Sequence, residues 1–157
     1  MSIKDYVIKE KEYISELRRY FHKYPEESLR EFETAKKIEE ELDKLNIPHK
    51  RIGETGVLGI IKGKKKSDKV LAIRADIDAL KIPDLKDVDY KSKNEGYNHA
   101  CGHDGHTASL LGTAKILKNR EEDLAGEVRL FFQQAEEIGQ GAKIFIKEGA
   151  LDGVQEI

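Results

Sequence analysis

The sequence predicts an α/β layer fold, and three observations support this prediction. Its 157 residues are enough for one domain with a modest core. Two amphipathic helical patterns come first, over residues 4–22 and about 30–45. Between Val70 and Phe132 a strand, a helix and a second strand follow one another, which predicts parallel strands joined by a right-handed crossover.

Both N-terminal helices are predicted from apolar residues that recur at helical spacing. Pro25 ends the first helix, and Asn46 and Pro48 stop the second. The first helix carries Val7, Ile14, Leu17 and Phe21, and the second carries Phe32, Ala35, Ile38, Leu42 and Leu45.

Strand-like runs follow over residues 56–61 and 69–74, and we expect them to pair as an antiparallel hairpin. The lysine-rich segment Lys62–Lys69 between them is interpreted as the solvated tip of that hairpin rather than as a binding patch. The polar stretch Lys81–Gly96 has no clear periodicity and is long for a loop, which is typical of functional or mobile segments.

The last elements are a helix over about residues 104–119, a strand over 127–133 and a helix over about 140–148 that Gly149 closes. Asp104 falls near the start of the first of these helices. A carboxylate at that position complements the free N–H groups and the helix dipole.

Charge and composition exclude several classes of protein. The chain has 28 basic and 30 acidic residues, a balance that argues against a nucleic-acid binder. No apolar run approaches the roughly 18 residues that a membrane span needs, and the N-terminus lacks the apolar region of a secretory signal. The single cysteine has no internal disulfide partner and suits a reducing compartment, so we expect a cytoplasmic protein.

The segment Asn98–His106 is the most informative part of the chain. It holds the only cysteine, Cys101, and three of the five histidines. An acidic pair, Glu136 and Glu137, follows the next apolar run. Thiolate, imidazole and carboxylate groups are the ligands that borderline divalent metals accept. A lone cysteine is usually a small buried apolar residue, but the histidine two positions later favours a metal-dependent hydrolase.

These groups are expected to converge at one edge of the sheet. Asp76 and Asp78 follow one predicted strand, and Glu136 and Glu137 follow the next. In open α/β sheets, sites form in the crevice outside the carboxyl ends of the strands. The Cys101 segment precedes the helix between these two strands, which brings it to the same edge.

The spacing within each motif suggests how the side chains point. Cys101 and His103 are two apart, so in an extended segment they face the same side, and the same holds for Asp76 and Asp78. Adjacent glutamates would point in opposite directions, so that one binds metal while the other accepts a proton from an activated water. We expect His99 to support a ligand by hydrogen bonding, whereas His106 is equally consistent with such support and with a structural role.

Four segments resemble the signature blocks of the M20 metallopeptidase family, and most closely its amidohydrolase branch. That branch includes hippurate hydrolases, N-acyl-amino-acid amidohydrolases and auxin-conjugate hydrolases. The resemblance covers nearly the whole chain, with the blocks in the family's order and spacing. The blocks are Leu17–Glu26, Arg74–Leu80, His99–His106 and Gln134–Glu137.

The resemblance implies a zinc-peptidase-like three-layer α/β fold with a mixed sheet. Residues 1–157 would form the N-terminal part of an incomplete catalytic domain. The inserted lid domain, which usually dimerises, would be absent, and so would the C-terminal part with two further histidine ligands. The expected partner is therefore a missing C-terminal half or a second copy in a homo-oligomer.

The resemblance also implies a role for each site residue. Cys101 would bridge two divalent ions, zinc or manganese with cobalt or nickel as alternatives, and His103 and Glu137 would be terminal ligands. Glu136 would be the general base, and Asp78 would assist catalysis from beneath the site. The residues expected around the ligands are Asp76, His99, Asp104 and His106.

Three positions depart from the usual pattern of the branch. Asn98 stands where it usually has methionine, and Gln134 and Lys81 stand where it usually has proline. None of these changes replaces a ligand, although Asn98 and Lys81 are expected to alter the pocket lining.

Three hypotheses follow. The first is an amidohydrolase that cleaves the amide bond of N-acyl amino acids or similar small conjugates. The second is a truncated, catalytically inactive metal-binding remnant of such an enzyme. The third is an interaction module with a structural Cys-His segment. The third requires a closed four-ligand site, and the sequence offers no fourth ligand at suitable spacing.

Overall fold

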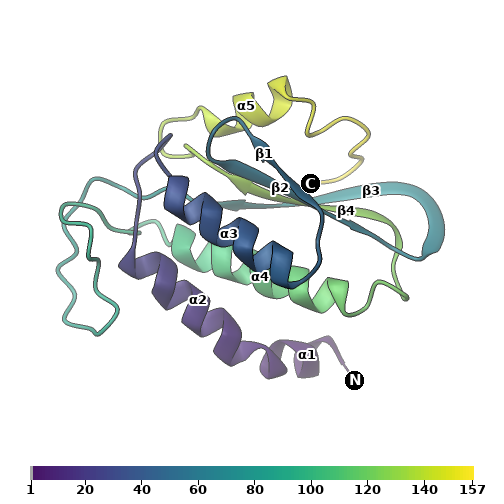
Figure 1. The fold of residues 1–157 in the computed structure, drawn as a ribbon, viewed down its shortest axis with the longest axis horizontal. Helices are drawn as coiled ribbons and strands as arrows, with labels where there is room; N and C mark the ends of the chain where they lie inside the picture. Colours follow the sequence, from purple (N-terminus) through teal and green to yellow (C-terminus); the bar gives the residue numbers. More distant parts are fainter. Residues whose placement is uncertain (1) are drawn as a thin grey trace.

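A four-stranded mixed sheet forms the centre of the protein (Figure 1). The computed structural model describes residues 2–157. The strand order is β1-β2-β4-β3; β3 and β4 are parallel, and the other two pairs are antiparallel. The strands are β1 (His49–Ile52), β2 (Gly56–Lys62), β3 (Lys65–Asp76) and β4 (Ala125–Gln133).

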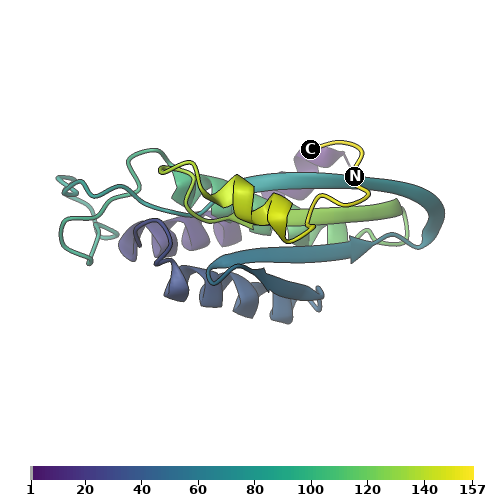
Figure 2. The same cartoon turned by 90° about the horizontal axis from the view of Figure 1, so that it is seen from above.

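Helices cover both faces of the sheet, which gives the predicted three-layer α/β architecture (Figures 1 and 2). Helices α3 and α4 pack on one face, α2 packs on α4 from outside, and α5 lies on the opposite face. The helices are α1 (Ile3–Lys9), α2 (Lys11–Lys23), α3 (Phe32–Lys44), α4 (His103–Lys118) and α5 (Gly141–Lys147).

Side chains of β4 alternate between the two faces of the sheet and contribute to a hydrophobic core on each face. Leu130 and Phe132 point into the core beneath α3 and α4, whereas Phe131 points into the smaller core beneath α5. Successive side chains on a strand face opposite sides, and a strand covered on both faces is apolar throughout. The consecutive apolar residues 130–132 of β4 are therefore explained by its central position.

The first predicted helix is interrupted at Glu10, which separates α1 from α2. Glu10 is buried, and its carboxylate lies 2.6 Å from Nζ of Lys115 on α4. This ion pair fixes the joint between the two helices against α4. The short strand β1 was not predicted, because its four residues, His49–Ile52, lack an apolar run.

The predicted hairpin of residues 56–61 and 69–74 is wrong. β2 and β3 do not pair with each other; β4 lies between them and pairs with both. The connection sweeps around the end of β4 (Figure 2). The lysine-rich segment belongs mostly to β3, and its register against β4 shifts between Lys65 and Val70. Burial of β4 between two strands therefore stabilises the sheet more than direct pairing of β2 with β3 across their short connection would.

The predicted crossover unit, the long loop and the helix-closing glycine are confirmed. β3, α4 and β4 form the parallel crossover unit, and residues 81–96 contain no helix or extended strand. Gly149, just beyond α5, has a φ of +70°, as a helix-closing glycine should. No helix among residues 2–157 is long and apolar enough to cross a membrane.

We expect Leu130→Ala to lower the free energy of unfolding by about 2–5 kcal/mol, because it leaves a cavity at a fully buried position of the central strand. Leu85→Ala makes the same chemical change at a side chain that is 88% exposed, and should cost about 0.5 kcal/mol or less. Urea denaturation of both variants checks this; equal losses would contradict the assignment of β4 to the core.

Candidate metal centre

Three potential metal ligands converge at the carboxyl ends of β3 and β4. Cys101, His103 and Glu137 each offer one ligand atom, and these atoms all lie within 4.8 Å of one another. They come from the turn before α4, its first residue and the turn after β4. The crevice outside the carboxyl ends of the strands is where α/β sheets usually place their sites.

The Cys101 segment does not have the extended conformation that the spacing argument assumed. Residues 100 and 101 form a turn, and Gly102 has a φ of +82° immediately before α4. Glycine adopts this left-handed conformation without steric cost. The turn leaves Cys101 exposed, places the His103 side chain at the sheet edge and buries His99.

The glutamate pair also lies in a turn rather than in extended backbone. The Oε2 atom of Glu136 and the Oε1 atom of Glu137 are each 3.9 Å from Nε2 of His103, so the two carboxylates do not point in opposite directions. Their burial differs instead: the Glu136 side chain is 41% exposed and that of Glu137 16%. Glu137 Oε1 is buried and has no hydrogen-bond partner among the described residues.

Asp78 orients His103. The Nδ1 atom of His103 lies 2.9 Å from the Asp78 carbonyl oxygen and 3.2 Å from its Oδ1. Both of these oxygens are acceptors, so Nδ1 carries the proton and donates. Nε2 is then left with its lone pair toward the glutamates, the arrangement that a metal-ligating histidine usually has.

Charge and burial shift the pKa values of these groups. Burial lowers the pKa of His103, but hydrogen bonds to Asp78 raise it by more, so it lies above its ordinary value. Burial raises the pKa of Asp78, while donors from His103, Ser28 and the Glu137 amide bring it below its ordinary value. The Glu137 carboxylate raises the pKa of the Cys101 thiol. A metal that binds here therefore has to displace protons.

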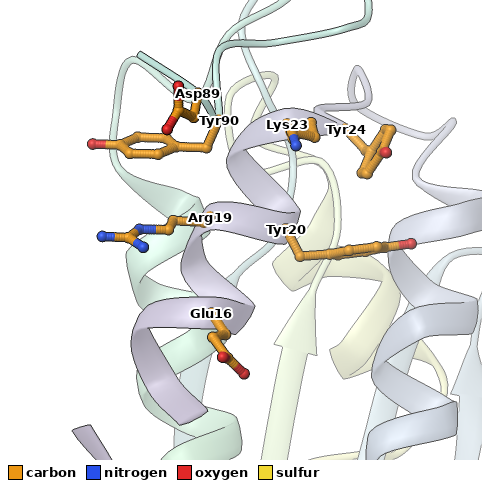
Figure 3. Close-up of a pocket in the computed structure, with 7 residues that line it drawn as sticks. All are labelled: Glu16, Arg19, Tyr20, Lys23, Tyr24, Asp89 and Tyr90. Carbon is orange, nitrogen blue, oxygen red and sulfur yellow. The ribbon is translucent and has the colours of Figure 1, made fainter. Parts of the chain in front are cut away.

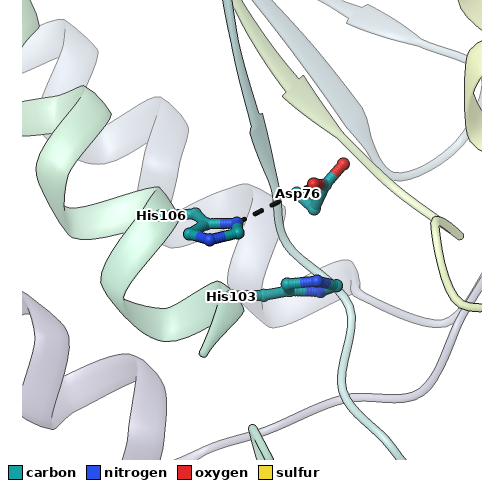
Figure 4. Close-up of side chains that lie close together, drawn as sticks. All are labelled: Asp76, His103 and His106. Atoms are coloured by element: carbon teal, nitrogen blue, oxygen red, sulfur yellow. Dashed lines mark ion pairs between the residues drawn. The ribbon is translucent and has the colours of Figure 1, made fainter. Parts of the chain in front are cut away.

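A second cluster shares His103 with the first. Asp76, His103 and His106 also place one ligand atom each within 4.8 Å of one another (Figure 4). Nδ1 of His106 is 3.8 Å from Oδ2 of Asp76. Because Nδ1 of His103 is engaged by Asp78, only its Nε2 is free for metal. The two clusters are thus alternatives around one imidazole, and Asp76 and His106 flank the first.

His99 and Asp104 lie behind the ligands. Both ring nitrogens of His99 are buried without a partner among residues 2–157, and burial lowers the pKa of His99 to about 4. Asp104 lies in the first turn of α4, as predicted, and its Oδ2 accepts hydrogen bonds from Arg18 at 3.1 Å and His22 at 2.7 Å.

Two contributing residues were not among the predicted site residues. His22 is buried between two carboxylates, with Nδ1 against Asp104 and Nε2 3.2 Å from Asp84. It thereby ties α2 to the start of α4 and to the 81–96 loop. Ser28 donates to Oδ2 of Asp78 at 2.7 Å. The Leu17–Glu26 block was a sequence signal for His22, whereas nothing in the sequence indicated Ser28.

The surface also carries an open groove of about 450 Å³ between α2 and the 81–96 loop (Figure 3). No residue that lines it belongs to the metal-ligating clusters. Two of its lining residues contact each other: the guanidinium of Arg19 lies 5.4 Å from the ring centroid of Tyr90, within cation–π range. The lining residues are Glu16, Arg19, Tyr20, Lys23, Tyr24, Asp89 and Tyr90.

The fold and the ligand cluster together fit a metal-binding α/β domain of the zinc-peptidase type. The sequence profile of peptidase family M20/M25/M40 matches residues 72–157. The chain belongs to this family, and the resemblance seen in its motifs is confirmed.

Known relatives agree with this assignment. An N-acetylcysteine deacetylase of Bacillus subtilis is 47% identical over 146 residues, covering 90% of this chain and 37% of the relative. The IAA-amino acid hydrolase ILR1-like 5 of Arabidopsis thaliana is 46% identical over 139 residues, covering 88% of this chain and 32% of the relative. This chain thus spans about a third of the length of these curated relatives.

A solved structure is similar to this chain in both sequence and fold. The crystal structure of a dinuclear metal binding peptidase of the M20 family from Bacillus subtilis superposes with a TM-score of 0.88 at 45% identity. The match covers 91% of this chain and 40% of that one. The three-layer fold is therefore the fold of this family.

We expect His99→Gln to flatten the pH dependence of the unfolding free energy of the metal-free protein. The pKa of His99 is about 4 in the fold against an ordinary value of 6.5, so unfolding takes up a proton between these pH values. Stability from this group is present above about pH 6.5 and is lost as the pH falls toward 4, by roughly 3 kcal/mol. Urea titrations in chelator across this range compare the two proteins, and identical slopes would contradict the burial of a neutral His99.

Proposed function

We propose that this protein is a metal-dependent amidohydrolase, which hydrolyses the amide bond of N-acyl amino acids or similar small conjugates. The observation that carries the proposal is the convergence of Cys101, His103 and Glu137, with Glu136 beside them. Support comes from the relatives, one named a deacetylase of an N-acetylated amino acid and another an amino acid conjugate hydrolase. Both names describe cleavage of an acyl–nitrogen bond.

The residues fit a divalent metal by their chemistry. One sulfur, one imidazole nitrogen and one carboxylate oxygen lie within reach of a single ion. The buried, unpartnered Oε1 of Glu137 gains a partner in such an arrangement. Sulfur and nitrogen donors favour zinc, and the carboxylate and imidazole also accept manganese, cobalt or nickel. By the resemblance, a complete site would hold two ions, and Cys101 would be a ligand of both.

A bound divalent ion would lower the pKa of a water molecule and polarise the substrate carbonyl. The chain's own residues handle the proton. Glu136 is the more exposed glutamate, so its carboxylate accepts the proton of the attacking water and passes it to the leaving amine nitrogen. Asp78 keeps the proton of His103 on Nδ1, which leaves Nε2 free for the ion.

Further ligands would have to complete this metal centre. The three ligands come from segments at one edge of the sheet, and a C-terminal half or a second copy would supply the others. The exposed thiol of Cys101 favours a reducing compartment, which is the cytoplasm for most proteins. The alternative is a catalytically inactive, metal-binding remnant, which would use the same three ligands, Cys101, His103 and Glu137.

One experiment separates the two candidates. We expect the purified chain to hold metal by elemental analysis, Cys101→Ala to lose it, and Glu136→Gln to keep it while hydrolysis of N-acetyl amino acids falls by about 10²–10⁴-fold. Glu122→Gln, an exposed glutamate away from the cluster, is the matched control and should change neither quantity.

Turnover by the chain would support the enzyme, and metal without turnover would support the remnant. Full hydrolysis by Glu136→Gln would overturn the assignment of the base. Absence of metal from the unsubstituted chain under metal-replete conditions would overturn both candidates.

A further inference from the structure

Glu31 is a buried carboxylate that the proposed chemistry does not use. It immediately precedes α3, and its residue exposure is 0%. No salt bridge to it exists among residues 2–157. A buried carboxylate without a cation is costly unless hydrogen bonds compensate it. The partners of Glu31 therefore indicate what its burial achieves.

Those partners join two distant turns. Oε2 of Glu31 accepts a hydrogen bond from Oγ1 of Thr55 at 2.7 Å, in the turn between β1 and β2. Oε1 accepts one from the backbone N–H of Ala135 at 2.9 Å, in the turn after β4. Burial raises the pKa of Glu31, although these donors and nearby backbone N–H groups oppose the rise. The carboxyl group is thus the central acceptor of a buried junction.

Ala135 has an unusual backbone conformation. Its φ is +52°, in the left-handed region that non-glycine residues adopt only at a cost. It directly precedes Glu136 and Glu137, so its conformation sets the direction in which both side chains leave the strand. Such strain persists only where surrounding contacts hold it, and the hydrogen bond to Glu31 is one of these contacts.

The turn is held at both ends by carboxylates. Glu31 accepts from the N–H of Ala135, and Asp78 accepts from the N–H of Glu137 at 3.0 Å. The backbone of Gly141 also approaches the start of this turn closely, since a Cβ atom at that position would lie 1.7 Å from the carbonyl oxygen of Gln134. In the turn held this way, the carboxylates of Glu136 and Glu137 each lie 3.9 Å from Nε2 of His103.

We propose that Glu31 is a positioning residue, whose buried carboxylate holds the left-handed Ala135 and thereby aims Glu136 and Glu137 at the metal centre. The proposal rests on the proposed function for the identity of that centre. It assigns to Glu31 an effect on metal binding through the Ala135 amide, with no contact to the ion.

The first test measures Co²⁺ affinity of the whole chain and two Glu31 variants. We expect Glu31→Ala to weaken binding by about tenfold or more, the usual effect of losing a group that orients a ligand. Glu31→Gln should stay within about threefold, because its amide oxygen still accepts from Ala135 and its NH₂ group donates to Thr55. Binding by Glu31→Ala with unchanged affinity would overturn the proposal.

Glu41→Ala is the matched control for a purely structural effect. Glu41 is also a buried glutamate and lies within α3, but its carboxylate contacts Tyr13, Lys37 and Lys44 instead of the site. We expect this variant to lose stability and to retain Co²⁺ affinity. An equal loss of affinity in Glu41→Ala and Glu31→Ala would overturn the positioning role. If Glu31→Ala does not fold, Glu31→Met fills the space without an acceptor and carries the same expectation.

A second test needs no metal. Hydrogen exchange of the Ala135 amide, followed by NMR in the metal-free chain, should accelerate at least tenfold in Glu31→Ala relative to the unsubstituted chain and to Glu41→Ala. Unchanged protection would overturn the proposal. Should the unsubstituted chain bind no Co²⁺, the metal centre of the proposed function fails, and this exchange experiment still decides the role of Glu31.

Discussion

The carboxylate of Asp78 is the interaction on which the rest of the site depends. Its Oδ1 faces Nδ1 of His103, and its Oδ2 accepts from Ser28 and from the amide of Glu137. One side chain thereby joins the end of β3, the start of α4, the turn after β4 and the segment before α3. The charge is buried, and its hydrogen bonds are charge-assisted and strong. Because each partner loses its orientation if the carboxylate moves, these four segments are coupled rather than independently placed.

Buried carboxylates recur around this centre, and each connects segments that are far apart in the chain. Glu31 joins α3 to the turn after β4 across 104 positions of sequence, and Asp104 joins α4 to His22 across 82. A buried polar network stabilises a single arrangement only when its members are satisfied. The protein thus uses polar contacts at the carboxyl ends of the strands, whereas apolar packing orders the remainder of the sheet.

The sequence predicted local structure and the parallel crossover, because apolar periodicity determines both. It did not predict that β4 lies between β2 and β3, since strand pairing depends on which strand gains most from double burial rather than on chain order. The motif residues were found by chemistry and resemblance, and the structure brings Cys101, His103 and Glu137 together. The prediction that these segments are extended was wrong. Gly102 and the left-handed Ala135 form turns, and these turns bring the side chains together. Glu31 was missed, since its partner Ala135 shows no sequence pattern that links the two.

Buried polar atoms without a hydrogen-bond partner are concentrated in the segments around the metal centre. Seven buried side-chain nitrogen or oxygen atoms lack a partner among the described residues, and six of them belong to the segments 74–80, 98–106 and 134–137. Native proteins keep such atoms few, because each carries the cost of desolvation. Two of the six are the amide oxygens of Asn98 and Gln134, the positions where the branch usually has methionine and proline. Gln134 recovers part of its cost by donating to the carbonyl of Ile52 at 3.0 Å. Local rules are usually broken where function requires it; two of these residues, Asp76 and Glu137, also belong to the ligand clusters, and the other three lie next to them in the chain or in the same motif.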